Sequence, residues 1–324
     1  MSPVQQLTSI LGSRHPVLLA PMAGISGGRL ARAVGEAGGF GLVGGGYGDA
    51  AWLAEELALC QGSPFGVGFI TWSLQRQPAL LAQALQAGAR AVMLSFGDVE
   101  PFVAQVRDEG AVLIAQVQTV EQARLARRAG AQVIVAQGGE GGGHSGVRGT
   151  MALVPAVCDA VDVPVVAAGG IADGRGLAAA LALGAAGVLA GTVFYAARES
   201  LANERAKDRL VEASGDDTVK SDVFDAVRGL QWPAGPWGLR TLRNGFTDRW
   251  HGQVDALRQD MPQLRDAYEA ARQRSDFDVA AVIAGEAADL VRAVRPAREI
   301  LDDMVAGAGA ILGRLPGVLS RATG

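Results

Sequence analysis

Several residue types and patterns that support common protein chemistries are scarce or absent in this chain of 324 residues. Lysine occurs only twice, as Lys207 and Lys220. The two cysteines, Cys60 and Cys158, are far apart, so they form neither the close spacing of a metal site nor a disulfide framework. No GxxxxGKS or GxxxxGKT loop is present, which excludes a P-loop nucleotide site. The formal net charge of -4 gives no general electrostatic case for binding nucleic acid or an anionic membrane.

Long apolar runs are missing as well. No segment stays apolar for the length of a membrane span, and the opening MSPVQQLTSILGSRH lacks a basic stretch followed by an apolar core. We therefore expect a soluble, cytoplasmic protein with reduced cysteines and with no membrane or nucleic acid among its partners. With 49% hydrophobic and 19% charged residues, the chain suits one barrel-sized domain with additions.

Glycine, in contrast, is abundant, and a recurring pattern of it marks the ends of helices. Ala-Gly or Leu-Gly closes a helical stretch and a short apolar strand follows at once, at Gly38, Gly88, Gly130 and Gly184. Glycine just past a helix end adopts the left-handed conformation that turns the chain back into a strand. The pattern, with the other apolar runs, predicts eight strands that start near Val17, Phe40, Phe65, Ala91, Val112, Val133, Pro164 and Val188.

These strands are apolar on both faces and each precedes a helical segment, as in a parallel sheet that is covered on both sides. Eight such units predict an α/β protein with a closed (β/α)8 TIM barrel rather than an open sheet. We expect the barrel to occupy residues 1–213. Residues 214–324 should form a mostly helical C-terminal extension that packs on the barrel or on a partner subunit of a homo-oligomer.

The densest cluster of glycines surrounds one histidine. Residues 136–149 read AQGGEGGGHSGVRG and follow the sixth predicted strand, with His144 among the glycines. Because glycine has no Cβ, such a loop lets backbone N–H groups approach a flat or phosphorylated ligand. Gly169-Gly170 and Gly191-Thr192 repeat this design after the next two strands. Three consecutive strand ends thus point at one ligand.

The remaining side chains at the predicted strand ends are mostly small or neutral. Both lysines lie beyond the eighth strand, which argues against a Schiff-base aldolase. The carboxylates near the rim, Asp98, Glu140 and Asp173, are too scattered for a metal-dependent enolase or hydrolase, so we expect no metal. A neutral pocket suits a cofactor that does the chemistry itself, and the loops after strands seven and eight usually hold its phosphate. FMN is the predicted cofactor, with Asp173 as the N-cap of the following helix.

Four motifs in order resemble those of one enzyme family. They are LAPMAG at 19–24, QGGEGGGHSG at 137–146, AAGGIADGRG at 167–176 and the pair Gly191-Thr192, and the stretch from Gly285 to Ala297 is also similar. Over roughly residues 15 to 200 the chain resembles the nitronate monooxygenases, formerly called 2-nitropropane dioxygenases. The resemblance implies a (β/α)8 barrel that holds FMN without a covalent bond. It also implies that alkyl nitronates and O2 are the substrates and that the reaction releases nitrite.

The resemblance further implies which residues contact the cofactor. These FMN contacts are Pro21, Met22, Ala23, Gln116, Gly142, Ala168, Gly169, Gly170, Gly191 and Thr192. Some relatives carry lysine where this chain has Gln116, and a neutral glutamine would favour the reduced, anionic flavin less. Where relatives share Gly-Thr-Arg-Phe, this chain has Val193, so an arginine contact is missing.

His144 is the predicted catalytic residue. Its ring follows the turn at 141–143, so the backbone should face the flavin and the imidazole should hydrogen-bond or deprotonate a substrate. The aromatic stretch 232–250 is interpreted as packing for the C-terminal helices. Trp72 either lines the pocket or covers the end of the barrel. The role of residues 214–260 stays open.

Two other functions remain as alternatives. Sister enzymes of the nitronate monooxygenases, the FMN-dependent NAD(P)H:quinone reductases and an enoyl-acyl-carrier-protein reductase, share the glycine-histidine motif. A barrel that binds a phosphorylated metabolite without flavin is the second alternative, and such a protein would purify colourless.

Overall fold

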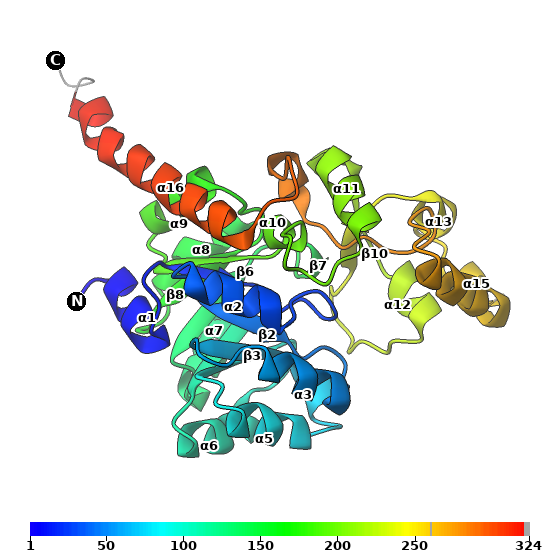
Figure 1. Ribbon diagram of the computed structural model, residues 1–324, viewed down its shortest axis with the longest axis horizontal. Helices are drawn as coiled ribbons and strands as arrows, with labels where there is room; N and C mark the ends of the chain where they lie inside the picture. Colours follow the sequence, from blue (N-terminus) through cyan, green and yellow to red (C-terminus); the bar gives the residue numbers. More distant parts are fainter. Residues whose placement is uncertain (260, 321–324) are drawn as a thin grey trace.

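The computed structural model describes residues 1–259 and 261–320, and a barrel of parallel strands forms its centre (Figure 1). Its strands are β1 (Val17–Leu19), β2 (Gly41–Gly44), β3 (Phe65–Ile70), β4 (Ala91–Ser95), β5 (Val112–Val117), β6 (Val133–Gln137), β8 (Val165–Ala168) and β9 (Gly187–Ala190). They lie in the order β1-β9-β8-β6-β5-β4-β3-β2, and a parallel bridge between Leu18 and Phe40 joins the two edges. The predicted (β/α)8 TIM barrel is confirmed.

Helices on the outside of the barrel follow the strands. They are α2 (Gly28–Glu36), α3 (Ala50–Ala58), α4 (Thr71–Leu74), α5 (Ala79–Gln86), α6 (Glu100–Asp108), α7 (Val120–Ala129), α8 (Thr150–Cys158), α9 (Gly174–Ala182) and α10 (Thr192–Tyr195). Asp173 caps α9 as predicted, because its side chain accepts hydrogen bonds from the N–H groups of Arg175 and Gly176. Gly38, Gly88, Gly130 and Gly184 all have positive φ, as the glycine pattern predicts for helix ends.

Side chains alternate along each strand between the barrel interior and the helices outside. On β4, Ala91 and Met93 face inward, whereas Val92 and Leu94 belong to the layer between strands and helices. The same period of two puts Ile114 of β5 and Val135 of β6 inside. The next inward position on each of these strands is polar. These positions are Ser95, Gln116 and Gln137, and they lie at the C-terminal end of the barrel.

Helix α1 (Pro3–Leu11) closes the opposite end of the barrel. It begins with a capping box between Ser2 and Gln5, and it ends at Gly12, whose φ of 72° is left-handed. Leu7 and Leu11 are fully buried against the interior side chains of the strands. Since one end is sealed by apolar packing, a ligand has access to the barrel only from the other end.

The last helix, α16 (Ala297–Ser320), packs mainly on α9 and also on α2 (Figure 1). Because β9 lies between β8 and β1, this location is that of the helix that follows the eighth strand of a TIM barrel. Strand β9 itself leads only into the four-residue helix α10. The division into 1–213 and 214–324 stays a prediction, and α16 completes the helical ring of the barrel from within the second part.

The chain between α10 and α16 forms a small layer over one side of the barrel mouth. Its elements are α11 (Glu204–Glu212), η1 (Gly215–Asp217), β10 (Thr218–Ser221), α12 (Val223–Arg228), β11 (Leu239–Leu242), α13 (Gly245–Trp250), α14 (Val254–Gln259), α15 (Met261–Gln273) and η2 (Glu286–Leu290). Strand β11 pairs antiparallel with β10 and with β7 (Gly143–His144), which lies in the glycine-histidine loop. We call residues 218–242 the cap segment. Within the described residues, no helix combines the length and the apolar character needed to cross a membrane.

Candidate active site

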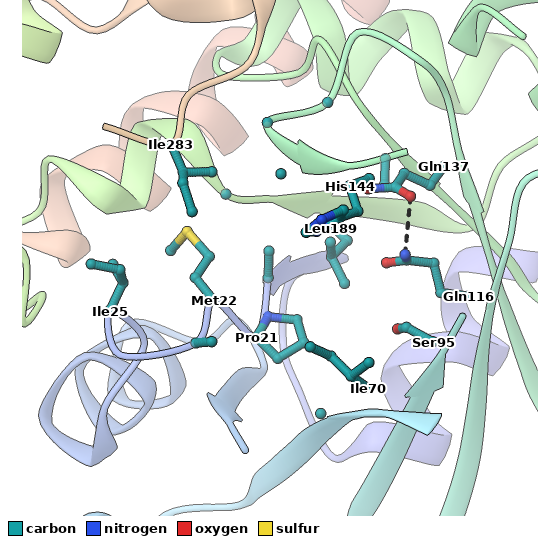
Figure 2. Close-up of a pocket in the computed structure, with 18 of the residues that line it drawn as sticks. Pro21, Met22, Ile25, Ile70, Ser95, Gln116, Gln137, His144, Leu189 and Ile283 are labelled. Atoms are coloured by element: carbon teal, nitrogen blue, oxygen red, sulfur yellow. Dashed lines mark hydrogen bonds between the residues drawn. The ribbon is translucent and has the colours of Figure 1, made fainter. Parts of the chain in front are cut away.

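A cavity of about 210 Å3 opens at the C-terminal ends of the barrel strands. Every residue that the sequence singled out for the site lines this cavity: Pro21, Met22, Ala23, Gln116, Gly142, His144, Ala168, Gly169, Gly170, Gly191 and Thr192. Figure 2 shows how Pro21 and Met22 of the β1 loop lie across the cavity from Gln137 and His144. The structure thus collects segments that are separated by up to 171 residues in the sequence, from Pro21 to Thr192, around one space.

Bare backbone forms the wall of the cavity at the ends of β8 and β9. Gly169 and Gly170 have φ angles of 100° and 70°, a left-handed conformation that side chains rarely adopt. The N–H groups of Gly169, Gly170 and Gly191 donate no hydrogen bond to any described residue. A Cβ on Gly191 would lie 3.4 Å from Cβ of Ala20 and 3.5 Å from Sδ of Met22, two other residues of the lining. This glycine nest therefore offers free N–H donors of the kind that hold a phosphate.

The stretch from Ile283 to Ala287 returns over the glycine nest. The N–H of Gly285 donates to Oγ1 of Thr192 at 2.9 Å. The N–H of Glu286 donates to the carbonyl oxygen of Glu140, also at 2.9 Å. A Cβ on Gly142 would fall 2.7 Å from the nitrogen of Gly285, so only glycine permits this approach. These contacts explain why residues near 285 accompany the other motifs in the sequence.

Three polar side chains form the floor of the cavity: Ser95 of β4, Gln116 of β5 and Gln137 of β6. Gln137 Nε2 donates to the carbonyl oxygen of His144 at 3.1 Å. Its Oε1 accepts from Gln116 Nε2 at 3.0 Å (Figure 2) and from Gln118 Nε2 at 2.9 Å. A backbone carbonyl can only accept, so the amide of Gln137 has one possible orientation, and Gln116 must turn its own Oε1 away from Gln137. Gln137 thereby links the Gln116 side chain to the backbone of His144.

The His144 side chain is buried and paired with a carboxylate. Its Nε2 lies 2.8 Å from Oδ2 of Asp225, a residue of α12. An ionised carboxylate accepts a hydrogen bond, so in the neutral ring Nε2 carries the proton and Nδ1 keeps its lone pair. Burial lowers the pKa of His144 below its usual value of 6.5, Asp225 opposes this, and Arg228 and Lys220 add to the lowering. The ring is therefore held as a neutral base near pH 7.

Aromatic rings surround the histidine. The ring of Trp232 stacks on His144, with centroids 3.5 Å apart and an interplanar angle of 20°. Phe96, which follows β4 in a left-handed conformation with φ of 64°, places its ring 5.1 Å from that of Trp232. Such strain in a residue that is not glycine is typical of functional sites. Trp232 lines the cavity, so the interpretation of the whole stretch 232–250 as helix packing is wrong for this residue. The interpretation holds for Trp250 of α13, which is buried in one cluster with Phe224 of α12, Leu257 of α14 and Tyr268 of α15.

Two cations of the cap segment hold the glycine-histidine loop in place. Lys220 Nζ donates to the carbonyl oxygens of Ser145, at 2.6 Å, and of Gly146. Arg240 donates to the carbonyl oxygen of Gly139 at 3.2 Å and forms an ion pair with Glu286 at 2.9 Å. The cap segment and the loop therefore form one connected structure, in which β11 also pairs with His144.

Sequence reasoning missed Asp225, Arg228, Trp232 and Gln137. The first three lie in residues 214–260, which gave no motif. Arg228 and Trp232 line the cavity, and Asp225 contacts His144, only because the cap segment folds over the barrel mouth. Gln137 could have been found, because it continues the inward series of Val133 and Val135 on β6. Within residues 1–259 and 261–320, no group of three or more His, Cys, Asp or Glu side chains could hold a metal ion.

The chain matches the family model of the nitronate monooxygenases over residues 4–73 and 71–307. A probable nitronate monooxygenase of Staphylococcus haemolyticus is 32% identical over 69% of this chain and 77% of its own length. A (3aS,4S,5R,7aS)-5-hydroxy-7a-methyl-1-oxo-octahydro-1H-indene-4-carboxyl-CoA dehydrogenase of Mycobacterium tuberculosis is 36% identical over 68% of this chain. The match covers only 64% of that dehydrogenase and 63% of its counterpart in Rhodococcus jostii.

Solved structures with the same fold include FabK from Thermotoga maritima. It has a TM-score of 0.83 and 31% identity, and the match covers 96% of this chain and 98% of that one. A nitroalkane oxidase from Streptomyces ansochromogenes has a TM-score of 0.81 and 28% identity over 96% of this chain and 99% of its own. Both matches cover 96% of this chain, so the similarity extends over the barrel and over the layer at its mouth.

Proposed function

Because the chain belongs to the nitronate monooxygenase family and is a flavin-dependent oxidoreductase, we propose that it binds FMN and oxidises alkyl nitronates with O2 to carbonyl compounds and nitrite. The observation that carries the proposal is that His144, in the wall of the glycine-lined cavity, is paired with the carboxylate of Asp225. It puts one buried base beside the space that a flat cofactor and a small substrate would share.

The groups that line the cavity support FMN as the cofactor. The free N–H groups of the glycine nest suit its single phosphate, and Pro21, Met22, Ala23, Gln116, Gly142 and Ala168 would contact the rest of the cofactor. When bound, FMN would accept electrons from the substrate and pass them to O2. The protein's own contribution would be to bind, to orient and to move a proton.

His144 would act on the substrate and not on the cofactor. Asp225 holds Nε2, which leaves Nδ1 to accept a hydrogen bond or a proton from the substrate. A neutral nitroalkane must lose its α-proton before it can react, and the imidazole is suited to take it. Asp225 would stabilise the imidazolium that results. A nitronate has already lost this proton, so it needs the base less.

Two measurements test this function. Purified protein should be yellow, and denaturation should release FMN and not FAD. Ethyl nitronate should then reduce the flavin without any nicotinamide, and aerobic turnover should consume O2 and release nitrite. A colourless protein, or one whose flavin does not respond to nitronate, would contradict the proposal.

A reductase function is the second candidate, and the likeness to FabK over nearly the whole chain favours it. In that case NADH or NADPH should bleach the flavin rapidly under anaerobic conditions, and a quinone or an enoyl thioester should reoxidise it. The anaerobic mixing experiment separates the candidates, because only one class of reductant should act quickly.

A further inference from the structure

Arg228 lies at the cavity with no hydrogen-bonding or ionic partner among the residues that the structure describes. It is the last residue of α12, one helical turn after Asp225, and its half-buried side chain lines the cavity. Its guanidinium carbon is 5.5 Å from the ring centroid of Tyr47, so the group lies on an aromatic face. Its side chain forms no hydrogen bond and no ion pair with any residue in 1–259 or 261–320.

The other cations of the cap segment behave differently. Lys220 and Arg240 are both engaged with carbonyl oxygens of the glycine-histidine loop. Arg228 keeps five N–H donors unused in a site that is partly shielded from water. A cation in such a place is costly unless something compensates its charge, so an anionic ligand is the expected partner.

The charges near His144 also favour an anion. Three charged groups act on the His144 ring, namely the carboxylate of Asp225 and the cations of Arg228 and Lys220. The carboxylate is already bonded to His144, and Lys220 is bonded only to neutral carbonyl groups. An incoming anion would therefore balance an excess of positive charge.

This anion is not the cofactor phosphate. Arg228 lies on Tyr47, which follows β2, whereas the glycine nest follows β8 and β9. Strand β1 separates β2 from β9, and β1 and β9 together separate β2 from β8, so Tyr47 and the glycine nest come from strands that are not neighbours in the barrel. Beside Arg228, the rings of Tyr47 and Trp232 both line the cavity and offer a flat apolar wall.

We propose that Arg228 is a substrate-recognition residue that binds a planar anion with two oxygens, a carboxylate or a nitronate, while the body of the ligand lies against Tyr47 and Trp232. The guanidinium matches this geometry because its parallel N–H groups donate to both oxygens at once. The inference rests on the proposed function for the nitronate, and it predicts that the site prefers nitronate anions over neutral nitroalkanes.

Benzoate and benzamide are matched probes for this site, since they share a flat ring and differ in charge. Their binding to the FMN-loaded protein can be followed by the change in flavin absorbance, with no turnover required. Benzoate should bind tighter than benzamide, and Arg228→Gln should weaken benzoate about 10- to 100-fold, as for a charged hydrogen-bonded pair, while benzamide is unchanged. Arg228→Lys should keep part of the benzoate affinity that Arg228→Gln loses.

Arg76→Gln is the control variant, because Arg76 also lies over an aromatic ring, 5.1 Å from the centroid of Trp72, but is exposed and outside the lining. It should change neither affinity. The inference is overturned if benzoate does not bind the parent protein, if Arg228→Gln affects both probes equally, or if Arg76→Gln has the same effect.

Steady-state kinetics with two substrates give a second test of the role of Arg228. Arg228→Gln should raise KM for ethyl nitronate more than it lowers kcat, and it should leave KM for neutral nitroethane unchanged. An equal change for both substrates would contradict anion recognition. If the parent protein binds benzoate as expected but does not oxidise nitronates, the anion site stands and the proposed reaction is wrong.

Discussion

The two sides of the cavity present different chemical groups to a ligand. The barrel side offers backbone, small side chains and neutral amides, from Gly169 and Gly191 to Gln116. The cap segment contributes the carboxylate of Asp225, the guanidinium of Arg228 and the indole of Trp232. A neutral surface with free N–H groups suits a large cofactor, whereas charges and rings suit the recognition and deprotonation of a small substrate. We infer that the barrel side holds the flavin and that the cap segment acts on the substrate.

The difference between the two sides also bears on why relatives of this chain have names that state different activities. The matches to FabK and to a nitroalkane oxidase cover 96% of this chain, so they include the barrel as well as the layer over its mouth. If the cap segment governs the substrate, changes there can alter the reaction without disturbing the cofactor site. The following predictions separate the two sides by experiment.

The largest effect is expected at the glycine nest. Gly170→Val should abolish FMN binding and give colourless protein, because the side chain would disturb the N–H groups that hold the phosphate. Gly110→Val is the matched control, since Gly110 has the same φ of 70° as Gly170 and nothing within 4 Å of its Cβ position. Both variants carry similar backbone strain of about 1–2 kcal/mol. Flavin content per chain is the measurement, and full occupancy in Gly170→Val would remove the basis for this placement.

A large effect on catalysis without loss of cofactor is expected at His144, which lies in the glycine-histidine loop and bonds to Asp225 of the cap segment. His144→Asn should keep FMN and lower kcat/KM for neutral nitroethane by about 10²- to 10⁴-fold, the usual contribution of a general base. The loss on preformed ethyl nitronate should be smaller, and the exposed His251→Asn should change neither value. Equal, small losses on both substrates would exclude the role as base.

A smaller effect concerns pH. The working form of His144 is neutral, so kcat/KM for nitroethane should be constant at high pH and fall as the pH drops through the pKa of the ring. Burial lowers that pKa, so the midpoint should lie below 6.5. Asp225→Asn removes the interaction that raises it, and the midpoint should move to still lower pH. A midpoint above 6.5, or one that does not respond to Asp225→Asn, would contradict this account of the pair.

The smallest effect is expected from a change of charge on the barrel side. Gln116→Lys would place a cation at the floor of the cavity, where Nζ could replace Nε2 as the donor to Gln137. A cation there should stabilise the reduced, anionic flavin and raise its midpoint potential by about 30 mV, which corresponds to 1.4 kcal/mol for a two-electron couple. Gln86→Lys, at an exposed position on α5, is the control. An unchanged or lower potential in Gln116→Lys would show that this floor position does not act on the flavin.

The sequence predicted the barrel side well and the cap side poorly, and the reason is physical. Glycines that follow a helix or a strand, and short runs that are apolar on both faces, are local signals, so the eight strands and the glycine-lined strand ends could be predicted from them. The contacts at Pro21, Met22, Ala23 and Gln116 came instead from the resemblance to the family. Asp225 lies 81 residues from His144, and nothing near it indicates that its helix folds over the barrel mouth. Trp232 was interpreted as packing because an aromatic residue in a loop looks the same in a core and in a cavity.

The most direct test of this division between the two sides is the dissociation constant of FMN from the double variant His144→Asn/Asp225→Asn. The account predicts that FMN binds as tightly as to the parent protein, although deprotonation of nitroethane is lost. Weakened FMN binding in the double variant would show that the His144–Asp225 pair supports the cofactor. It would contradict the assignment of the cap segment to the substrate.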